Sequence, residues 1–435
     1  MPVFKAYDVR GNYPSEINED LAERLGSATV KFLKSKRIAI GRDVRLSAPS
    51  IAAAVARGAG GEVIDIGLCT TPMLYFAVGH LGLDGGIMVT ASHNPPEDIG
   101  FKVCRERAFP IGEKTGLKEI EKLCGERPTG GSKVTSISLI REYREHLRKQ
   151  VTRIPKIKIA VDTAHGAVGV HFDAIFGDLP VDFVRLCFEP DGHFPSHEPN
   201  PLKDENVRDL VAAMKETKAD LGVAFDGDGD RCMFLGPGGT RIPSDLVTVL
   251  LARSELRRSP GAAIVYDLRS SRVVAEEIRK AGGVPIRDRV GHAFIKETMK
   301  KNNAALGGEL SGHYYFRDHF FADSGMMAFA KVLDLLGHEG KPIDELLAPL
   351  RRTRATGEIN FKVADKDAIM KAVAATFKDG RQDWLDGITV EYDDWWFNVR
   401  ASNTEPLLRL NLEAATQEGL DRARERLFAI LGNPE

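Results

Sequence analysis

The stretch Gly85-Gly86-Ile87-Met88-Val89-Thr90-Ala91-Ser92-His93-Asn94-Pro95 is the most direct indication of the fold class of this chain. Its apolar half has the composition of a short buried strand. The polar half and the next residue include Asn94, Pro95 and Pro96, which stop a helix from starting there. Enzymes of the α/β class present reactive groups in such loops at the carboxyl edge of a sheet. We therefore expect an α/β fold with Ser92 at the tip of a strand; a serine in an ordinary turn is the alternative.

A second loop, Asp226-Gly227-Asp228-Gly229-Asp230-Arg231, follows the apolar run 221–225. Its carboxylates would repel one another without a cation between them, and the alternating glycines let the backbone bring them together. Hard oxygen ligands favour Mg²⁺. A calcium-binding EF-hand loop needs glycine at position six and glutamate at position twelve, where this chain has Arg231 and Pro237. We expect a Mg²⁺ site on Asp226, Asp228 and Asp230, with a solvated acidic turn as the alternative.

Two further loops carry groups suited to sugars and phosphates. In 308–313, Glu309 and Ser311 stand two residues apart, so in an extended loop they would point the same way toward vicinal hydroxyls. In 400–409, two arginines flank hydroxyl and amide side chains, a combination that suits phosphate. A polar hairpin turn is the alternative reading of this last loop.

Composition excludes several classes of function. The chain has 435 residues, enough for three or four domains, and a formal net charge of -2, which gives no general attraction to nucleic acid or anionic membranes. No stretch approaches the roughly 18 apolar residues of a membrane helix, and residues 1–5 lack the apolar core of a signal peptide. We expect a cytoplasmic protein without nucleic-acid or membrane partners.

The cysteines argue against metal and disulfide frameworks. There are five, an odd number, and no two form a CxxC pair. We therefore expect neither a zinc site nor structural disulfides, as in a reducing compartment. Cys232 directly follows the acidic loop, and we interpret it as a small buried residue that starts the next strand.

Strands and helices alternate through most of the sequence, which predicts parallel α/β units. Asn18 is a suitable N-cap for the first helix. The expected strands are 37–40, 62–66, 156–161 and 262–266, and a charged helix is expected around 140–151. We divide the chain into domains 1–138, 139–240, 241–350 and 351–435.

The C-terminal part has a different order of elements. Beyond Arg351-Arg352-Thr353-Arg354, a linker by composition, we expect an antiparallel α+β domain with its helices on one face. The expected elements are a strand at Glu358–Val363, a helix at Lys366–Phe377, three strands that end near Leu412 and a helix at Gln417–Leu431.

Taken together and in this order, the four loops resemble the α-D-phosphohexomutase superfamily, in particular its phosphomannomutase/phosphoglucomutase members. The resemblance covers nearly the whole chain and includes Phe4–Gly11, Gly41-Arg42-Asp43, 190–195 and Gly291-His292. It implies three similar mixed α/β domains and a different fourth domain around a central active-site cleft. One departure stands out: the family's Asn-Gly-x-Lys is here Ile99-Gly100-Phe101-Lys102.

The activity implied by the resemblance is reversible interconversion of hexose 1-phosphate and hexose 6-phosphate, with mannose, glucose or both as the sugar. Ser92 would carry a phosphoryl group, and a hexose 1,6-bisphosphate would be both intermediate and activator. Mg²⁺ would be held by the three aspartates and, through its phosphate, by Ser92. The expected partners are small sugar phosphates, and the expected state is a monomer or dimer.

The resemblance also implies roles for individual side chains. The catalytic candidates are Ser92, Lys102, Arg10, Arg231, His313 and His292. Lys102, Arg10 and His313 are candidates for transferring the proton of the sugar hydroxyl, and Lys102 is favoured; structural roles remain the alternative for both histidines. The substrate-binding candidates are Tyr7, Glu309, Ser311, Arg400, Ser402, Asn403, Thr404 and Arg409.

Three other functions stay open. A phosphoglucosamine mutase is disfavoured by Leu310, because that subfamily resembles Gly-Glu-Gln-Ser-Gly-His. A serine- and metal-dependent phosphatase would need to admit water, and no zinc-type cluster of His and Asp accompanies Ser92 in the sequence. A non-catalytic sugar-phosphate sensor would not need the complete set of reactive groups.

Overall fold

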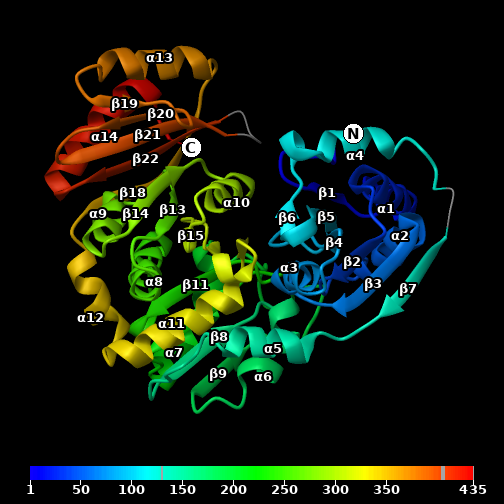
Figure 1. Cartoon of the computed structure of the whole chain (residues 1–435). Helices are drawn as coiled ribbons and strands as arrows, with labels where there is room; N and C mark the ends of the chain where they lie inside the picture. Colours follow the sequence, from blue (N-terminus) through cyan, green and yellow to red (C-terminus); the bar gives the residue numbers. More distant parts are fainter. Residues whose placement is uncertain (129–130, 403–406, 435) are drawn as a thin grey trace.

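The structure is a computed structural model of the chain and describes residues 1–128, 131–402 and 407–434. It contains four sheets, one for each region of the sequence (Figure 1). The N-terminal region, in blue, lies opposite the C-terminal region, in orange and red, and the green and yellow regions lie below and between them. The predicted α/β class, with a distinct C-terminal domain, is confirmed.

The first sheet has the strand order β1-β5-β4-β2-β3-β7, with β6 beside β5. Its strands are β1 (Val9–Asn12), β2 (Arg37–Arg42), β3 (Gly61–Leu68), β4 (Gly85–Val89), β5 (Asp98–Arg105), β6 (Phe109–Pro110) and β7 (Ser132–Ser136). Its helices are α1 (Glu19–Leu33), α2 (Ala48–Ala59), α3 (Thr71–His80) and α4 (Leu117–Leu123). Asn18 caps α1 by accepting from the backbone N–H of Leu21, as predicted.

The second and third sheets share one plan: three parallel strands followed by two antiparallel ones. The second domain contains α5 (Ile140–Arg148), β8 (Lys158–Asp162), α6 (Ala167–Phe176), β9 (Asp182–Leu186), α7 (Arg208–Thr217), β10 (Leu221–Phe225), β11 (Cys232–Gly236) and β12 (Thr240–Arg241). The third contains α8 (Ser244–Arg258), β13 (Ala263–Asp267), α9 (Arg272–Lys280), β14 (Val284–Asp288), α10 (His292–Lys301), β15 (Leu306–Gly308), β16 (Tyr314–Phe316), β17 (Ala322–Asp323), α11 (Gly325–Glu339) and α12 (Ile343–Leu347).

The Ser92, Asp226 and Glu309 loops occupy equivalent positions in the three domains. Each loop connects the last parallel strand to the first antiparallel one: β4 to β5, β10 to β11 and β15 to β16. Because strand direction reverses at these loops, each sheet presents its polar loop at the carboxyl end of a parallel strand. Cys232 begins β11 and is buried, as predicted.

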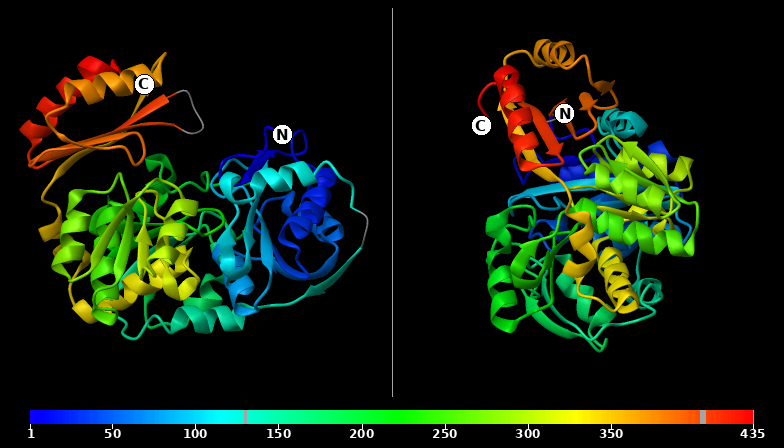
Figure 2. Two further views of the ribbon diagram at one scale, coloured as in Figure 1. Left: turned by 45° about the horizontal axis from the view of Figure 1, so that its top comes forward. Right: turned by 90° about the vertical axis from the view of Figure 1, so that its left-hand side faces the viewer.

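The fourth sheet is antiparallel throughout, with order β18-β22-β21-β20-β19. It contains β18 (Arg354–Lys362), β19 (Arg381–Asp383), β20 (Ile388–Glu391), β21 (Trp395–Ala401) and β22 (Leu407–Ala414), with α13 (Lys366–Thr376) and α14 (Gln417–Leu431) together on one face, as Figure 2 shows. The prediction of three strands after the first helix was wrong, because four follow it. The additional strand, β19, is a short polar edge strand without apolar alternation.

The cores of the domains are not equally separate. One large apolar cluster joins parts of the first three domains, including residues of α3, α6, α8 and α11. The fourth domain has an apolar cluster of its own. It meets the third domain through polar contacts, such as the ion pairs from Arg287 to Asp383 and Glu391. The fourth domain is therefore built as a separately packed body.

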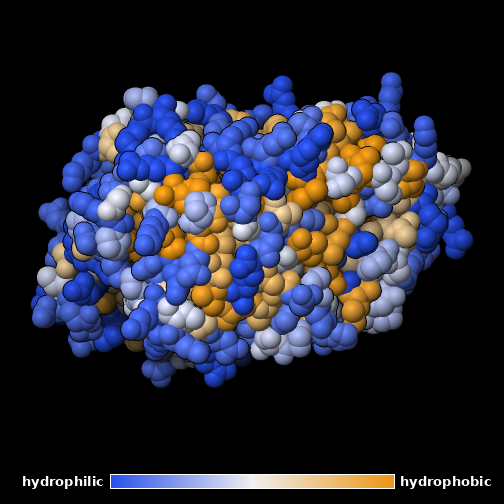
Figure 3. All heavy atoms as spheres, turned by 90° about the horizontal axis from the view of Figure 1, so that it is seen from below, coloured by the Kyte–Doolittle hydropathy of each residue, from blue (hydrophilic) through white to orange (hydrophobic). Residues whose placement is uncertain are grey.

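Seen from below, the surface is mostly hydrophilic, with hydrophobic residues near the middle of that face (Figure 3). Within the described residues, none of the helices combines the length and the apolar composition needed to cross a membrane.

Candidate active site

Ser92 lies in the loop after β4, as predicted, and its side chain meets the acidic loop of the second domain. Its Oγ donates to Asp226 Oδ2 at 3.0 Å, and its backbone N–H donates to Thr90 Oγ1 at 2.8 Å. The backbone at Ser92 has φ 54°, in the left-handed region that non-glycine residues rarely adopt. Such a conformation persists only where surrounding contacts stabilise it.

Arg45 supplies those contacts, and the sequence analysis did not identify it. Its guanidinium, fully buried, donates to the backbone carbonyls of Ser92 (3.1 Å), Asn94 (2.6 Å) and Asp98 (2.8 Å), and also to that of Pro95. Asp43 pairs with Arg45 at 3.2 Å and accepts from Thr90 Oγ1. Burial raises the pKa of Asp43, although Arg45 and Thr90 act in the opposite direction. The Gly41-Arg42-Asp43 motif was the only indication in the sequence.

The three carboxylates of the acidic loop converge as predicted. Asp226, Asp228 and Asp230 are buried, and one oxygen of each lies within 4.8 Å of the other two. Oδ1 of Asp228 and Oδ1 of Asp230 have no hydrogen-bond partner. Burial, and then the charges of Asp230 and Asp228, raise the pKa of Asp226 well above its usual range. Buried, unpartnered and mutually repelling oxygens fit a hard divalent cation.

Lys102, on β5, partly neutralises this cluster. Its Nζ donates to Asp228 Oδ2 at 2.6 Å and also to Asp230. Burial would lower the pKa of Lys102, but the surrounding carboxylates outweigh burial and raise it. The amine is therefore held protonated in this arrangement.

Ile99, the departure from the family pattern, lies on the same strand as Lys102. Its side chain is fully buried in the apolar core of the first domain. Asn94 supplies an amide nearby, because its side chain bonds to Arg10 at 2.6 Å and to Asp98 at 2.8 Å. The substitution leaves these hydrogen bonds of the Ser92 loop in place.

Arg231 and His313 form a pair across two domains. Arg231 Nε donates to His313 Nε2 at 3.0 Å, and His313 Nδ1 lies 2.9 Å from Asp323. His313 Nε2 therefore carries a lone pair and Nδ1 carries the proton. Arg10 pairs with Asp8 at 2.6 Å.

All of the catalytic candidates line one cavity of about 540 Å³ between the first three domains. The predicted residues in its wall are Tyr7, Arg10, Ser92, Lys102, Asp230, Arg231, His292 and His313. Burial lowers the pKa of His292 to about 3, so its imidazole is neutral at physiological pH. Tyr7 packs edge-on against His292 with ring centroids 5.5 Å apart.

The Glu309 loop differs from the extended loop that we expected. Backbone bonds from Glu309 to His313 and from Gly312 to Glu309 close it into a tight turn, and Gly312 has φ +83°, which suits glycine. The Glu309 carboxylate is buried, accepts from the Gly291 N–H at 3.2 Å and is also bonded to Tyr315. The prediction that Glu309 and Ser311 point the same way was therefore wrong. It assumed an extended loop, and in a turn residues two positions apart do not share a direction. Glu309 and Ser311 do not line the cavity.

Arg400 and Arg409 stand opposite each other on β21 and β22. Glu358, on β18, bonds to Arg400 at 2.6 Å and lies 3.3 Å from Arg409. Arg269 of the third domain lies 3.8 Å from the same carboxylate. Ser402 is buried, and its N–H donates to the Leu407 carbonyl at 2.9 Å. Asn403 and Thr404 lie outside the described residues.

A larger cavity of about 650 Å³ lies between the third and fourth domains and contains none of the predicted site residues. Its wall includes Arg287, which forms ion pairs with Asp383 and with Glu391.

Sequence and structure comparisons identify the family of this chain. Four domain descriptions of phosphoglucomutase/phosphomannomutase match in order: alpha/beta/alpha domain I at residues 1–128, domain II at 141–239, domain III at 243–353 and the C-terminal domain at 358–430. A relative described as "Phosphohexose mutases" from Xanthomonas campestris pv. campestris is 42% identical over 99% of both chains. A phosphomannomutase from Escherichia coli is 41% identical over 98% of both.

Among solved structures, a phosphoglucomutase/phosphomannomutase family protein from Burkholderia thailandensis superposes with a TM-score of 0.92. It is 32% identical and covers 100% of this chain and 98% of its own. The fold and the site thus define an isomerase of the phosphohexomutase class. The chain belongs to the phosphoglucomutase/phosphomannomutase family, and it is an enzyme of carbohydrate metabolism.

Proposed function

We propose that this phosphohexomutase interconverts the 1-phosphates and 6-phosphates of mannose, glucose or both, through phosphorylation of Ser92. The observation that carries the proposal is the meeting of Ser92 Oγ with Asp226 in a cavity also lined by Lys102 and Arg231. Phosphoryl transfer requires positioning and charge neutralisation more than a strong base.

The reaction consists of two transfers. In the first, the bond from phosphorus to Ser92 Oγ breaks as phosphorus bonds to the free hydroxyl oxygen of the sugar monophosphate, and the hydroxyl proton passes to a base. The hexose 1,6-bisphosphate then turns. The bond from its other phosphorus to the sugar oxygen breaks as that phosphorus bonds to Ser92 Oγ, and the released sugar oxygen takes the proton back from the base. Lys102, Arg10 and His313 remain the candidates for the proton transfer, since each lines the cavity.

Asp226, Asp228 and Asp230, together with an oxygen of the phosphoserine, would hold a Mg²⁺ ion. When bound, it would supply positive charge to the transferring group and offset the carboxylates that raise the pKa of Lys102. With Mg²⁺ bound, we favour Lys102 as the group that transfers the proton. Arg231 supplies further positive charge beside the phosphoserine.

Arg400 and Arg409 would hold the phosphate that is not being transferred, together with Ser402 and the Asn403 and Thr404 side chains. Glu309, Ser311 and Tyr7 would contact the sugar. Because the Glu309 carboxylate is engaged with Gly291 and Tyr315 in this structure, sugar binding there requires these hydrogen bonds to rearrange.

The leading test is the mass of the intact protein before and after incubation with glucose 1,6-bisphosphate. Wild type should gain one phosphoryl group and Ser92→Ala none. Full mutase turnover by Ser92→Ala would overturn the covalent mechanism. A panel of mannose, glucose and glucosamine phosphates compared by kcat/KM gives the sugar preference, and release of inorganic phosphate identifies a phosphatase.

The reducing cytoplasm is our proposal for where the enzyme works, because its five cysteines are all free thiols. We propose a monomer or dimer, and a light-scattering measurement of molar mass distinguishes the two.

A further inference from the structure

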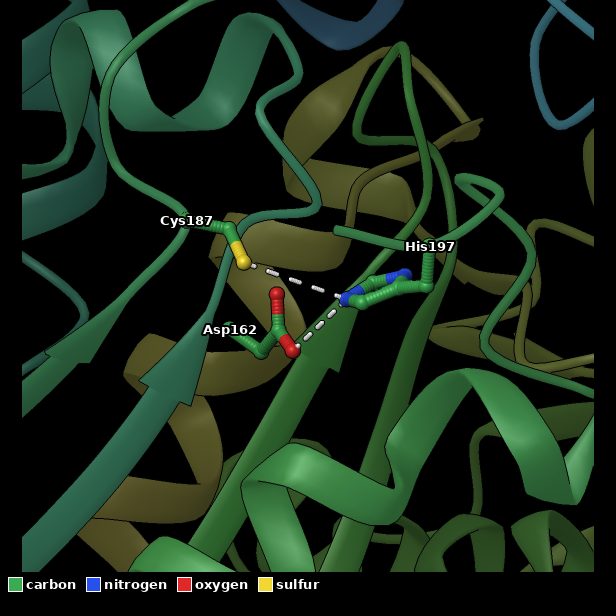
Figure 4. A group of neighbouring side chains, drawn as sticks. All are labelled: Asp162, Cys187 and His197. Atoms are coloured by element: carbon green, nitrogen blue, oxygen red, sulfur yellow. Dashed lines mark hydrogen bonds and ion pairs between the residues drawn. The ribbon is translucent and has the colours of Figure 1, made fainter. Parts of the chain in front are cut away.

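Three side chains of the second domain converge at a point outside the mutase cavity: Asp162, Cys187 and His197 (Figure 4). His197 Nε2 lies 3.0 Å from Asp162 Oδ2 and 4.0 Å from Cys187 Sγ. One ligand atom from each residue lies within 4.8 Å of the other two. These separations suit three donor atoms around one small cation.

Each of the three side chains is held by the fold. Asp162 is the last residue of β8, and its Oδ1 accepts from the Ala164 N–H at 2.8 Å. Cys187 directly follows β9 with φ 56°, and its carbonyl accepts from Thr163 Oγ1 at 2.7 Å and from the His165 N–H at 2.8 Å. The donor set is therefore positioned before any ligand arrives.

The orientation of the imidazole favours a cation at this point. His197 Nδ1 lies 2.9 Å from the backbone carbonyl of Glu198, which can only accept, so Nδ1 carries a proton. In the neutral ring Nε2 then directs its lone pair at the Asp162 carboxylate and the Cys187 sulfur. A carbonyl that fixes the tautomer in this way is the usual outer-shell partner of a metal-bound histidine.

In the metal-free protein, His197 holds a proton where the metal would bind. Burial would lower the pKa of His197, but the hydrogen bonds with Asp162 and Cys187 outweigh burial and raise it to about 10. That proton must leave before a metal binds, so metal binding competes with the ion pair between His197 and Asp162.

We propose that Asp162, Cys187 and His197 form a three-ligand site for a transition metal ion of the zinc class. Mixed S, N and O donors select zinc-class ions, whereas the all-oxygen cluster of Asp226, Asp228 and Asp230 suits Mg²⁺, so the two sites differ in selectivity. Asp162 is buried and His197 nearly so, while Cys187 is half-buried, which leaves an approach for the ion and a position for a water ligand.

A metal ion at the proposed site would hold together two segments, 162–167 and 197–199, that contact the acidic loop. The Ala167 N–H donates to the Gly227 carbonyl at 2.9 Å, and a Cβ on Gly166 would come within 2.7 Å of the same oxygen. Pro199, two residues after His197, also lies close to Gly227, because a Cβ on Gly227 would come within 3.2 Å of its side chain. A metal ion would therefore join the 162–167 and 197–199 segments, and we expect it to stabilise this domain against heat.

The test is titration of the reduced, EDTA-treated full-length protein with Co²⁺, which reports its ligands in its absorption spectrum. Wild type should show a thiolate-to-cobalt charge-transfer band that saturates at one Co²⁺ per chain. Cys187→Ser should lose the band, and His197→Gln should weaken Co²⁺ binding at least about tenfold. Asp228→Asn, the matched control, should keep the band, because it alters only the oxygen cluster.

A second measurement needs no variant and so does not depend on folding of a mutant. Saturating Zn²⁺ should slow alkylation of Cys187 by iodoacetamide in wild type, followed by mass spectrometry of peptides, and Mg²⁺ should not. Absence of the cobalt band in wild type, or its persistence in Cys187→Ser, overturns the proposal. Neither result bears on the mutase reaction, which is scored separately by Ser92 phosphorylation.

Discussion

At the scale of single residues, only a few side chains set the net charge of the acidic cluster. Three buried carboxylates face Lys102, Arg231 and His313, and one oxygen each of Asp228 and Asp230 is left without a hydrogen-bond partner. Metal binding by this cluster should therefore be sensitive to the loss of a single carboxylate charge.

Asp228→Asn should weaken Mg²⁺ binding and lower kcat by about 100-fold or more, because the lost interaction is strongest in the transition state. Mg²⁺ titration of mutase activity after EDTA treatment measures both effects. Asp182→Asn, which removes an exposed carboxylate of the same domain, should leave both unchanged. Activity that survives EDTA would contradict the metal assignment.

Arg45 is the residue on which the geometry of Ser92 depends. Arg45→Lys keeps the charge but cannot reach four carbonyls at once, so it should cost about 2–4 kcal/mol of stability and slow phosphorylation of Ser92. Urea unfolding and intact mass measure the two effects. Arg37→Lys, at an exposed pair with Glu62, should cost less than about 0.5 kcal/mol. Equal effects of the two substitutions would refute this role.

At the scale of elements, strand register brings together the two arginines that we propose to bind phosphate. Arg400 and Arg409 are nine positions apart in sequence and directly opposite on β21 and β22, and Glu358 joins them from β18. If phosphate binds these arginines as proposed, it must displace Glu358 from both guanidinium groups, so this carboxylate would compete with the substrate.

Arg409→Ala should therefore lower kcat/KM about 10- to 100-fold for the 1-phosphate and the 6-phosphate alike, since both use the same phosphate-binding loop. Glu358→Gln should act in the opposite sense and lower KM for both isomers. Initial rates in both directions give these values, with exposed Arg381→Ala as the control. A loss confined to one isomer would argue against a shared phosphate site.

At the scale of the whole molecule, histidines lie where the first three domains share a core. His146 of α5 and His319 of the third domain are buried, with Nε2 and Nδ1 3.0 Å apart, and Phe76 of α3 packs against His146. Burial lowers the pKa of His146 to about 4 and that of His319 well below its usual range. Both are therefore neutral in the folded enzyme.

The unfolded chain binds more protons at these histidines between about pH 6.5 and pH 4, so stability should fall as pH falls through that window. For His146 alone the loss is on the order of 3 kcal/mol. The thermal midpoint measured from pH 7.5 to pH 4.5 should drop less steeply in His146→Asn than in wild type. Exposed His193→Asn should follow wild type, and an unchanged slope in His146→Asn would contradict this account.

Local patterns in the sequence were enough to predict most of the elements and most of the residues that line the cavity. β4, β10 and α14 lie at their predicted positions, because apolar runs bounded by glycine, proline or polar loops are local patterns. Loop composition and order were likewise enough to identify the family and to predict that the three aspartates converge, since alternating glycines let a short segment bring its carboxylates together.

Contacts between residues that are distant in sequence, in contrast, could be seen only in the folded structure. Arg45 is 47 residues from Ser92, Glu358 is 42 from Arg400, and Asp162, Cys187 and His197 come from three segments of the second domain. The sequence argued against zinc because no CxxC was present, yet the fold assembles a sulfur, a nitrogen and an oxygen at one point. Spacing along the chain reveals contacts only within a turn or a strand, whereas packing of separate elements places side chains together without any local pattern.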